Sequence, residues 1–433
     1  MTNPSDSMPV GAMRASTERI LSLQEAISLA RAECRRLGLT TEIHHLGAHP
    51  SQVIRIAARD REGRLVFGVG KGAGEQCLAS ALFETIEHYW IQHGLHLPDS
   101  SAHDTRVLPI EEIVAQETLD TDQVLARLAK DFPGARIRCI LYERFGSDEA
   151  TLWYPFFLKN PFARFLTAPL DDSDAFSSYF RYSSNSGSAS GATEEDAALH
   201  ALLETVERDA VSLALLDWFV DPAGAARVVA RESLPEDLAA LYESATKVLG
   251  VPPALLDITT DLAVSAFMAI PSQENDSCGL YGAGASLDPA YAAERALREV
   301  LQAHYVNCAV PDLAQRHRRY VAQLERWPVL QRCARLAPSD ILRTSRIVSL
   351  TKSLKREQES VARQIETVVS GLAERGFAAW RHDCNPGVTK NSGRVVVTSV
   401  LVPGLDSFCL AASGEAVLPT GRGWTRLRAL ATG

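Results

Sequence analysis

Three stretches of the chain share one pattern, in which a glycine-rich run leads into an apolar segment that carries the same stripe of polar side chains. The stripe falls at positions i, i+4 and i+7, and its members are Ser80, Glu84 and Glu87, then His200, Glu204 and Glu207 followed by Arg208, then Arg295, Glu299 and Gln302. Residues with this spacing lie on one face of a helix. The chain is therefore expected to carry three similar polar stripes on three separate helices.

Around the second stripe, the segment AALHALLETVERDAVSLALLDWF is apolar at nearly all remaining positions, which predicts a mostly buried helix. A buried carboxylate is costly unless it is paired or binds a metal. The glutamates of the three stripes outnumber the local lysines and arginines, so divalent cations would resolve an excess of negative charge. Because Mg²⁺ prefers carboxylates together with phosphate oxygens, the pattern favours a magnesium site beside a nucleotide phosphate. One Glu-x-x-Glu pair alone is typical of an exposed face, so the prediction depends on the threefold repetition.

Strand-like and helix-like segments alternate along the chain, and this alternation predicts an α/β fold. Strands are expected over residues 53–58, 64–69, 136–142, 151–157, 394–402 and 408–412. Helices are expected over residues 18–38, 75–94, 193–218 and 287–306, and in the polar or charged stretches 99–135 and 310–376. The last residues, 413–433, are expected to form a loop.

The composition limits the class of protein. The chain is 46% hydrophobic and 22% charged, as in ordinary globular proteins, and its formal net charge of −9 does not favour a nucleic-acid surface. It has no signal-peptide pattern and no apolar run long enough to cross a bilayer, so we expect no membrane association and a cytoplasmic location. Eight scattered cysteines without a CxxC pair argue against a structural zinc site and, in a reducing compartment, against disulfides.

Two familiar nucleotide-binding motifs do not account for the first stripe. The P-loop motif GxxxxGK[ST] is absent, because Lys71 is followed by glycine. Residues 68–73 fit the GxGxxA form of the dinucleotide fingerprint, which requires an acidic residue near the end of a following strand. Glu84 and Glu87 lie on the helix instead, so a Rossmann-type site is not favoured.

The three segments that contain the stripes resemble the three motifs of the YcaO family. GKGAGEQCLASALFETIEHY resembles the first motif, SGSASGATEEDAALHALLETVERDA the second and GAGASLDPAYAAERALREVLQ the third, in the same order. The segment VVVTSVLVPGLDSF is similar to the tail strand of the family, so the resemblance covers roughly residues 60–412. It implies a YcaO-type α/β fold, with β-sheets flanked by helices and an ATP site without a P-loop.

The resemblance also implies roles for individual residues. It assigns ATP binding to Lys71, Ser80, Glu84, Arg208, Arg295, Glu299 and Gln302. It assigns Mg²⁺ binding to Glu84, Glu87, Asp196, Glu204 and Glu207. Lys71 fits an exposed turn lysine equally well, and no catalytic residue is assigned.

The domain organisation is expected to be simple. Residues 1–17 are rich in Ser, Pro, Met and Gly without an apolar period, which predicts a flexible tail. Residues 18–433 are expected to form a single domain. It would consist of an N-terminal part over 18–60, the core motifs over 60–412 and a C-terminal tail over 413–433.

The activity implied by the resemblance is MgATP-dependent activation of a peptide backbone amide. A nucleophile adds to the carbonyl, the resulting oxyanion takes the γ-phosphoryl group, and phosphate then leaves. Attack by a Cys, Ser or Thr side chain gives an azoline, attack by sulfide a thioamide and attack by an amine an amidine. The preferred hypothesis is an azoline-forming cyclodehydratase that modifies a ribosomally made precursor peptide. Backbone thioamidation with a sulfur-delivery partner is second, and a non-catalytic scaffold with the same fold is third.

The same resemblance implies partners, although the chain departs from the family pattern in places. A separate leader-peptide-binding protein of the E1-like or ThiF-like kind is expected, and an azoline dehydrogenase and a homodimer are compatible with the family. Ala192 replaces the usual asparagine, Asp196 the usual glutamate and His88 the common arginine. The sequence ends in RALATG rather than in the proline-rich tail of many azoline-forming members. The different ending weakens the azoline hypothesis, and Ala192 and Asp196 mildly favour the scaffold, whereas the retained glutamates and arginines oppose the scaffold.

Overall fold

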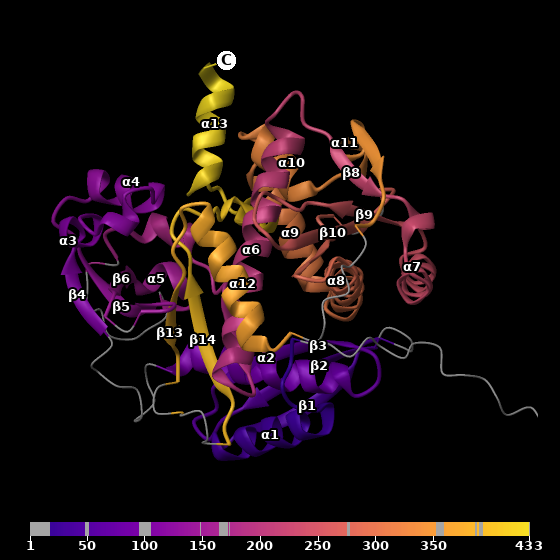
Figure 1. The fold of residues 1–433 in the computed structure, drawn as a ribbon, viewed down its shortest axis with the longest axis horizontal. Helices are drawn as coiled ribbons and strands as arrows, with labels where there is room; N and C mark the ends of the chain where they lie inside the picture. Colours follow the sequence, from indigo (N-terminus) through magenta and orange to yellow (C-terminus); the bar gives the residue numbers. More distant parts are fainter. Residues whose placement is uncertain are drawn as a thin grey trace, which may run out of the picture.

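The described chain forms three β-sheets with helices packed against them (Figure 1). The computed structural model describes residues 18–47, 52–94, 105–147, 149–163, 172, 174–274, 278–351, 359–385, 388 and 393–432. The predicted flexible tail, residues 1–17, lies outside the described residues and stays a prediction. The α/β fold predicted from the sequence is confirmed.

The first sheet is antiparallel and lies at the bottom of Figure 1. Its strands, in order, are β1 (Thr40–His45), β2 (Gln52–Arg59) and β3 (Leu65–Gly72). Helix α2 (Gln76–His93) packs on β3 and β2, and α1 (Leu23–Arg36) packs on α2. Ser22 starts α1 through a capping box with Glu25, which satisfies two backbone N–H groups at the helix terminus.

The second sheet has the strand order β4-β5-β13-β14-β7, with β6 paired to the free side of β5. The strands are β4 (Thr105–Pro109), β5 (Arg136–Arg144), β6 (Thr151–Pro155), β7 (Ser188–Gly191), β13 (Trp380–Asp383) and β14 (Val396–Leu401). The short helices beside it are α3 (Ile110–Val114), α4 (Gln123–Asp131) and α5 (Phe156–Lys159). The sheet therefore combines an early segment of the chain with strands from near its end.

The third sheet has the strand order β11-β10-β9-β8-β12. The strands are β8 (Ala226–Val229), β9 (Pro253–Asp257), β10 (Ser265–Pro271), β11 (Gly282–Ser286) and β12 (Ser345–Val348). Helix α8 (Pro289–Ala309) packs on β11 and β10, and α7 (Glu236–Leu249) packs on α8. Three further helices follow in the chain: α9 (Pro311–Gln323), α10 (Pro328–Arg335) and α11 (Pro338–Ile341).

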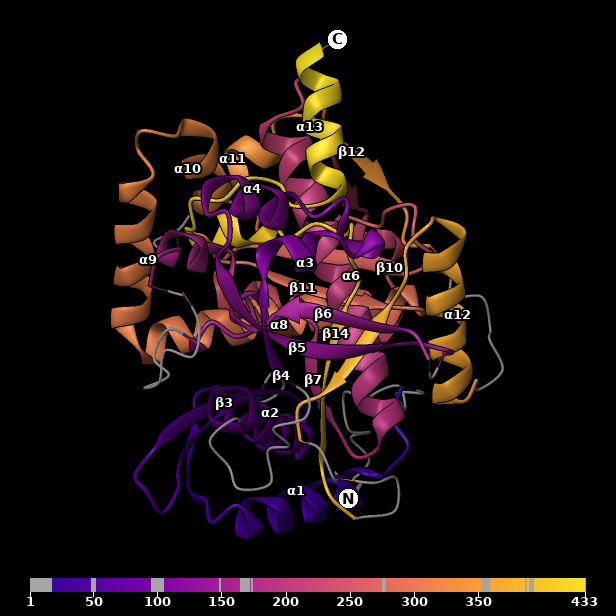
Figure 2. The same cartoon turned by 90° about the vertical axis from the view of Figure 1, so that its left-hand side faces the viewer.

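Helix α6 (Glu194–Phe219) lies between the second and third sheets, in the middle of both views (Figures 1 and 2). It packs on β7 and β14 of one sheet, on β11 of the other and on α12 (Val361–Glu374). Apolar residues are buried around most of its circumference, as the sequence predicts for a helix with contacts on several sides. The polar residues of its stripe are therefore held in a largely buried setting.

Strands β7 and β11 form in glycine-rich stretches for which no strand was expected, and β3 extends the strand predicted over residues 64–69 to Gly72. Their glycines let a helix lie directly on strand backbone. A Cβ at Gly70 would lie 2.0 Å from the carbonyl oxygen of Cys77 in α2, and one at Gly282 would lie 2.1 Å from the backbone nitrogen of Val300 in α8. Each glycine strand therefore fixes the helix that follows it at very short range.

Four other predicted segments differ from the structure. Residues 105–109 form β4 because they pair with β5, and residues 345–348 form β12 because they pair in parallel with β8. Residues 408–413 form a 3-10 helix rather than a strand. The segment expected to be a C-terminal loop contains helix α13 (Arg422–Thr432). Its first turn is fixed by Asp406, whose carboxylate accepts from the N–H groups of Gly421 and Gly423, each at 2.9 Å.

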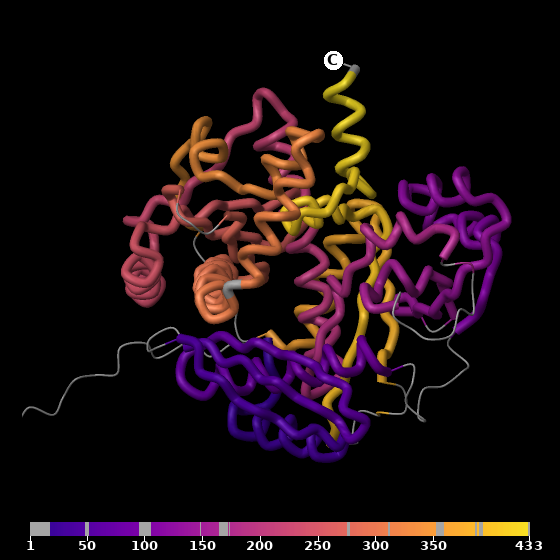
Figure 3. Tube along the Cα trace, turned by 180° about the vertical axis from the view of Figure 1, so that it is seen from behind, coloured from indigo at the N-terminus to yellow at the C-terminus, as the bar shows by residue number. Residues whose placement is uncertain are grey.

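The C-terminal helix projects from the body of the protein, on the side away from the first sheet (Figures 1 and 3). In the part of the chain that the structure describes, no helix is both long and apolar enough to cross a bilayer. All eight cysteines are free thiols. Five of them are buried: Cys34, Cys77, Cys139, Cys333 and Cys409.

Candidate functional site

Each polar stripe lies on the helix that follows one glycine strand, in the units β3–α2, β7–α6 and β11–α8. Side-chain contacts close these three units into a ring. The N–H of Ser190 in β7 donates to Glu87 Oε2 of α2 at 3.1 Å, and the hydroxyl of Ser190 donates to the carbonyl oxygen of Phe83 at 2.9 Å. Arg295 of α8 approaches Glu207 of α6, with 3.9 Å between Nη2 and Oε2.

Helix α8 completes the ring through two contacts with β3. Gln302 Nε2 donates to the carbonyl oxygen of Val69 at 3.1 Å. Lys71 forms an ion pair with Glu299. Residues from all three stripes therefore face one another, although they come from segments far apart in the sequence.

Carboxylates of α2 and α6 form an acidic part of this site. The pKa of Glu87 lies well above its ordinary value because of burial and the negative charges of Glu204 and Glu84. Burial and Glu299 also raise the pKa of Glu84, although His88 and Lys71 oppose the shift. Because these carboxylates come from two helices and repel one another, the protein places more acidic groups here than its own cations neutralise.

Cations gather beside the acidic part, around His200 of α6. The pKa of His200 lies well below its ordinary value, first because of burial and then because of Arg19, Arg295 and Lys71. The Arg19 Nη2 atom lies 3.2 Å from His200 Nδ1. Positive potential from three side chains favours an anion at this position, next to a cluster that favours a cation.

Arg208 links the two glutamates of α6. Its Nη2 atom lies 3.4 Å from Glu204 Oε1, and its Nη1 atom lies 3.5 Å from Glu207 Oε1. Burial raises the pKa of Glu207, while Arg208 and Arg295 oppose that shift without reversing it. Arg208 therefore supplies a partly buried guanidinium at the edge of the acidic part, in a position suited to an oxyanion.

The arrangement fits Mg²⁺ held jointly by protein and phosphate. Among the residues that the structure describes, no three His, Cys, Asp or Glu side chains form a ready-made metal cage. Mg²⁺ is usually bound by one or two carboxylates together with phosphate oxygens and water. Glu84, Glu87 and Glu204 offer the carboxylates, and the neighbouring cations offer a place for phosphates.

Asp196 is set apart from the other acidic residues. It lies in the first turn of α6, eight residues before Glu204 and so about 12 Å away along the helix axis. Its side chain is 1% exposed, and its Oδ1 atom accepts from the N–H of Ile20 at 3.1 Å. The structure does not bring Asp196 next to the other predicted ligands, and its role in Mg²⁺ binding stays a prediction.

The segment just before α1 contacts the site. Glu18 is 6% exposed, accepts from the hydroxyl of Ser286 at 2.5 Å and lies 3.8 Å from Nη1 of Arg295. The adjacent Arg19 donates to the carbonyl oxygen of Asp196 at 3.4 Å. Residues 18–20 therefore place a carboxylate, from Glu18, and a guanidinium, from Arg19, against residues of the predicted site.

Most of the predicted site residues meet in this ring. The structure brings together Lys71, Glu84, Glu87, Glu204, Glu207, Arg208, Arg295, Glu299 and Gln302. Ser80 is partly buried on α2, one helical turn before Glu84. Sequence reasoning missed Glu18, Arg19 and Ser190, whose importance arises from contacts between distant segments. His200 belonged to the second stripe but received no role.

The fold and the site define an α/β protein in which three strand–helix units surround a mixed cluster of carboxylates and cations. Residues 69–406 match the family model described as YcaO cyclodehydratase, ATP- and Mg²⁺-binding. The chain therefore belongs to the YcaO family, as the sequence motifs predict, and the expected cofactors, ATP and Mg²⁺, agree with the description of that family.

A sequence relative and two solved structures agree with this assignment. An uncharacterized protein of Methanothermobacter thermautotrophicus is 28% identical over 384 residues, which cover 86% of this chain and 91% of the relative. YcaO from Methanopyrus kandleri bound with AMPPCP and Mg²⁺ has a TM-score of 0.61 and 18% identity, with 95% of this chain and 98% of that one covered. A heterocyclase in complex with substrate and cofactor has a TM-score of 0.60 and 17% identity, with 92% of this chain and 55% of that one covered. At these identities, the two structures establish the similarity of fold.

Proposed function

We propose that this protein uses MgATP to activate a backbone amide of a peptide, and that its product is an azoline formed at a Cys, Ser or Thr residue. The observation that carries the proposal is the cluster of partly buried carboxylates, Glu84, Glu87 and Glu204, beside the cations around His200. A divalent cation would neutralise the carboxylates, and a triphosphate would neutralise the neighbouring cations. The family description and the M. kandleri structure with AMPPCP and Mg²⁺ support the same ligand.

The residues of the chain would chiefly bind and orient. Glu84, Glu87 and Glu204 would hold Mg²⁺, while Lys71, Arg208, Arg295 and Gln302 would surround the phosphates. Bound MgATP supplies the phosphoryl group that turns the amide oxygen into a leaving group. Fixed charges in a buried site are effective because they need no reorganisation as charge develops.

The atoms of azoline formation balance without any other reactant. A bond forms between the side-chain sulfur or oxygen and the carbonyl carbon, and the carbonyl oxygen departs as part of phosphate. The nucleophile and the amide nitrogen each lose a proton. The peptide thus loses one water for each azoline, while ATP becomes ADP and phosphate. We propose that a separate leader-peptide-binding protein delivers the peptide.

Peptide mass provides the decisive test. The purified chain would be incubated with MgATP, a candidate precursor peptide encoded beside its gene and the neighbouring partner proteins. The expected result is an ATP-dependent loss of one water per modified residue, abolished in Glu204→Gln and Glu87→Gln. Exposed Glu366→Gln on α12 is the matched control and should leave the reaction unchanged.

Other mass changes would redirect the proposal. Exchange of oxygen for sulfur that requires a sulfide source would replace azoline formation with thioamidation, and the amide-activation step would stand. MgATP binding without hydrolysis or a mass change, in the presence of every partner, would favour the non-catalytic scaffold. Absence of MgATP binding would overturn the proposal altogether.

A further inference from the structure

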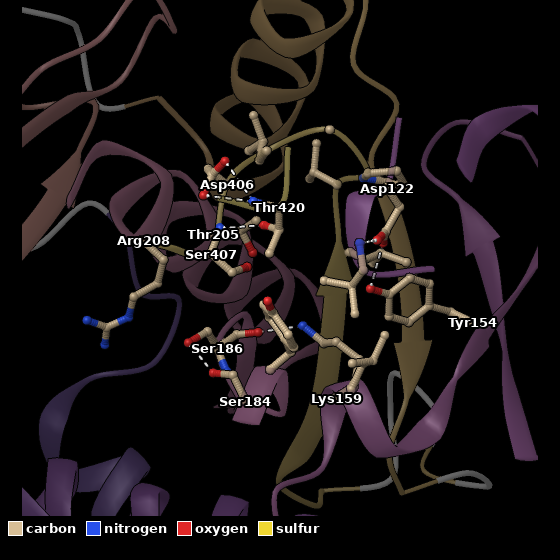
Figure 4. A pocket seen from close by; sticks show the side chains of 18 of the residues that line it. Asp122, Tyr154, Lys159, Ser184, Ser186, Thr205, Arg208, Asp406, Ser407 and Thr420 are labelled. Carbon is tan, nitrogen blue, oxygen red and sulfur yellow. Dashed lines mark hydrogen bonds between the residues drawn. The ribbon is translucent and has the colours of Figure 1, made fainter. Parts of the chain in front are cut away.

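We propose that a pocket beside Arg208 receives the reacting carbonyl of the peptide, and that Lys159 donates a hydrogen bond to that carbonyl oxygen. The inference rests on the amide-activating function proposed above and adds to it a substrate position and a catalytic residue. The pocket has a volume of about 90 Å³ and lies between α5, the segment before β7, helix α6 and the C-terminal segment after β14 (Figure 4).

The pocket adjoins the glutamate cluster through α6. Thr205 and Arg208 line it, and both lie on the same helix as Glu204. In Figure 4 the guanidinium of Arg208 points away from the pocket, while Lys159 points into it toward Ser186. Arg208 therefore borders both this pocket and the predicted phosphate site, and we place the reacting carbonyl oxygen at their common edge, where it can reach the γ-phosphoryl group.

Lys159 has hydrogen-bonding capacity to spare. Its ammonium donates to the backbone carbonyl oxygens of Ser186 and of Val400, the second at 3.2 Å. An ammonium has three N–H donors, so one remains for a ligand. In the described part of the chain no carboxylate forms an ion pair with Lys159, which is unusual for a partly buried ammonium.

The acidic residues that line the pocket are already engaged. The Asp122 carboxylate accepts from the N–H groups of Val124 and Leu125 at the start of α4 and from the hydroxyl of Tyr154. The Asp406 carboxylate accepts from backbone N–H groups on both sides of the C-terminal turn. Neither competes for Lys159, so the donor that remains is directed at an acceptor brought by the ligand.

The rest of the lining suits a neutral ligand. Apolar wall residues come from α5, β14 and the segment that follows it, and they are Leu158, Val400, Leu401, Val402, Pro403 and Leu405. Hydroxyl groups of Ser184, Ser186 and Thr205 lie among them. An uncharged group with a carbonyl acceptor matches this lining, and a backbone amide of a peptide is such a group.

The location explains what Lys159 would do. When the nucleophile bonds to the carbonyl carbon, the carbonyl π electrons move onto oxygen and the nucleophile releases its proton to solvent. The Lys159 ammonium would stabilise the resulting negative charge before phosphoryl transfer. Burial lowers the pKa of Lys159 to about 8, while Glu204 opposes the shift, so the ammonium form predominates near neutral pH.

The test compares Lys159→Met with exposed Lys247→Met on α7 as the matched control. MgATP affinity is measured by calorimetry, and peptide modification by mass spectrometry with the precursor peptide and partners used above. The expected result for Lys159→Met is an unchanged Kd for MgATP and a fall in kcat of about 100-fold. Lys247→Met should match the wild type in both measurements.

Each contrary result has a distinct meaning. An unchanged kcat in Lys159→Met, with the wild type active, would overturn the role of Lys159 and leave the proposed function intact. A large loss of MgATP affinity would place Lys159 in the nucleotide site and overturn the peptide pocket. An inactive wild type would overturn the proposed function, and this inference would fall with it.

A second measurement avoids any risk that Lys159→Met fails to fold. The wild-type protein would be treated with acetic anhydride, with and without the precursor peptide, and acetylation located by mass spectrometry. Protection of Lys159 by the peptide, with unchanged labelling of Lys247, supports the pocket. Equal labelling of Lys159 in both samples, at a peptide concentration that saturates turnover, would overturn it.

Discussion

Lys71 and Glu299 form an ion pair that joins β3 to α8, although 228 residues separate them in the sequence. The surroundings of Glu299 explain why it retains its charge. Burial raises the pKa of Glu299, but Lys71, Arg208 and Arg295 together bring it below the ordinary value. The pair thus connects two strand–helix units at the point where we expect phosphates to bind.

Substitution of Lys71 should weaken both the fold and ligand binding. Lys71→Met removes the partner of Glu299, so we expect the free energy of unfolding at neutral pH to fall by about 1 kcal/mol. The difference from wild type should vanish as the pH falls through the lowered pKa of Glu299, because protonated Glu299 no longer gains from Lys71. Urea unfolding at several pH values measures this, and Lys71→Arg is the matched control. A difference that grows in acid would contradict the prediction.

Glu87 should destabilise the ligand-free protein. Its raised pKa means that stability is lost as the pH rises from the ordinary carboxylate value through the folded-state value. Glu87→Gln keeps an oxygen for the N–H of Ser190 and removes the charge, so thermal unfolding at neutral pH should show a gain of about 1 kcal/mol or more. MgATP should stabilise the variant less than the wild type. A variant that is less stable than wild type without ligand would refute the proposed charge excess.

The three helices and their polar stripes could be predicted because they are local features. The spacing of Glu204 and Glu207 is set by helical geometry, which is readable from a short segment. The strand character of β7 and β11, and of the last residues of β3, could not be predicted, because glycine disfavours strands except where another backbone approaches closely. Gly70 and Gly282 meet that condition only once α2 and α8 are packed on them.

The other features that could not be predicted involve residues whose surroundings come from distant parts of the chain. Asp196 was expected among the metal ligands and that role stays a prediction, but its contact with the N–H of Ile20 could not be foreseen. No role was predicted for Lys159, because its separation from carboxylates depends on how α5, β7 and β14 pack together. Helix α13 was expected to be a loop because its first turn depends on Asp406, which precedes it by sixteen residues.

Glu18 should compete with nucleotide for Arg295. Its carboxylate is buried against that guanidinium and accepts a hydrogen bond from Ser286. Glu18→Gln removes the competing charge, so calorimetry should show a Kd for MgATP that is about fivefold lower. Exposed Glu42→Gln on β1 is the matched control and should not change the Kd. Weaker binding in Glu18→Gln would mean instead that Glu18 holds Arg295 in its binding position.

Arg422 should be among the residues most needed for stability. Its guanidinium binds both carboxylate oxygens of Asp209, whose side chain is 0% exposed, and it also contacts Asp261. Arg422→Met would leave Asp209 buried without a counter-charge, so we expect a loss of at least about 3 kcal/mol in the free energy of unfolding.

Denaturant unfolding measures the Arg422→Met effect, and the solvent-exposed pair between Arg363 and Glu366 provides the matched control. Arg363→Met should leave the midpoint nearly unchanged, because exposed ion pairs contribute little. The double variant Arg422→Met with Asp209→Asn should recover part of the loss, since it removes the stranded charge. If Arg422→Met instead unfolds at the wild-type midpoint, the ion pair between Arg422 and Asp209 does not hold the C-terminal helix in place. In that case the wall of the Lys159 pocket that Asp406 and Thr420 form does not depend on this ion pair either.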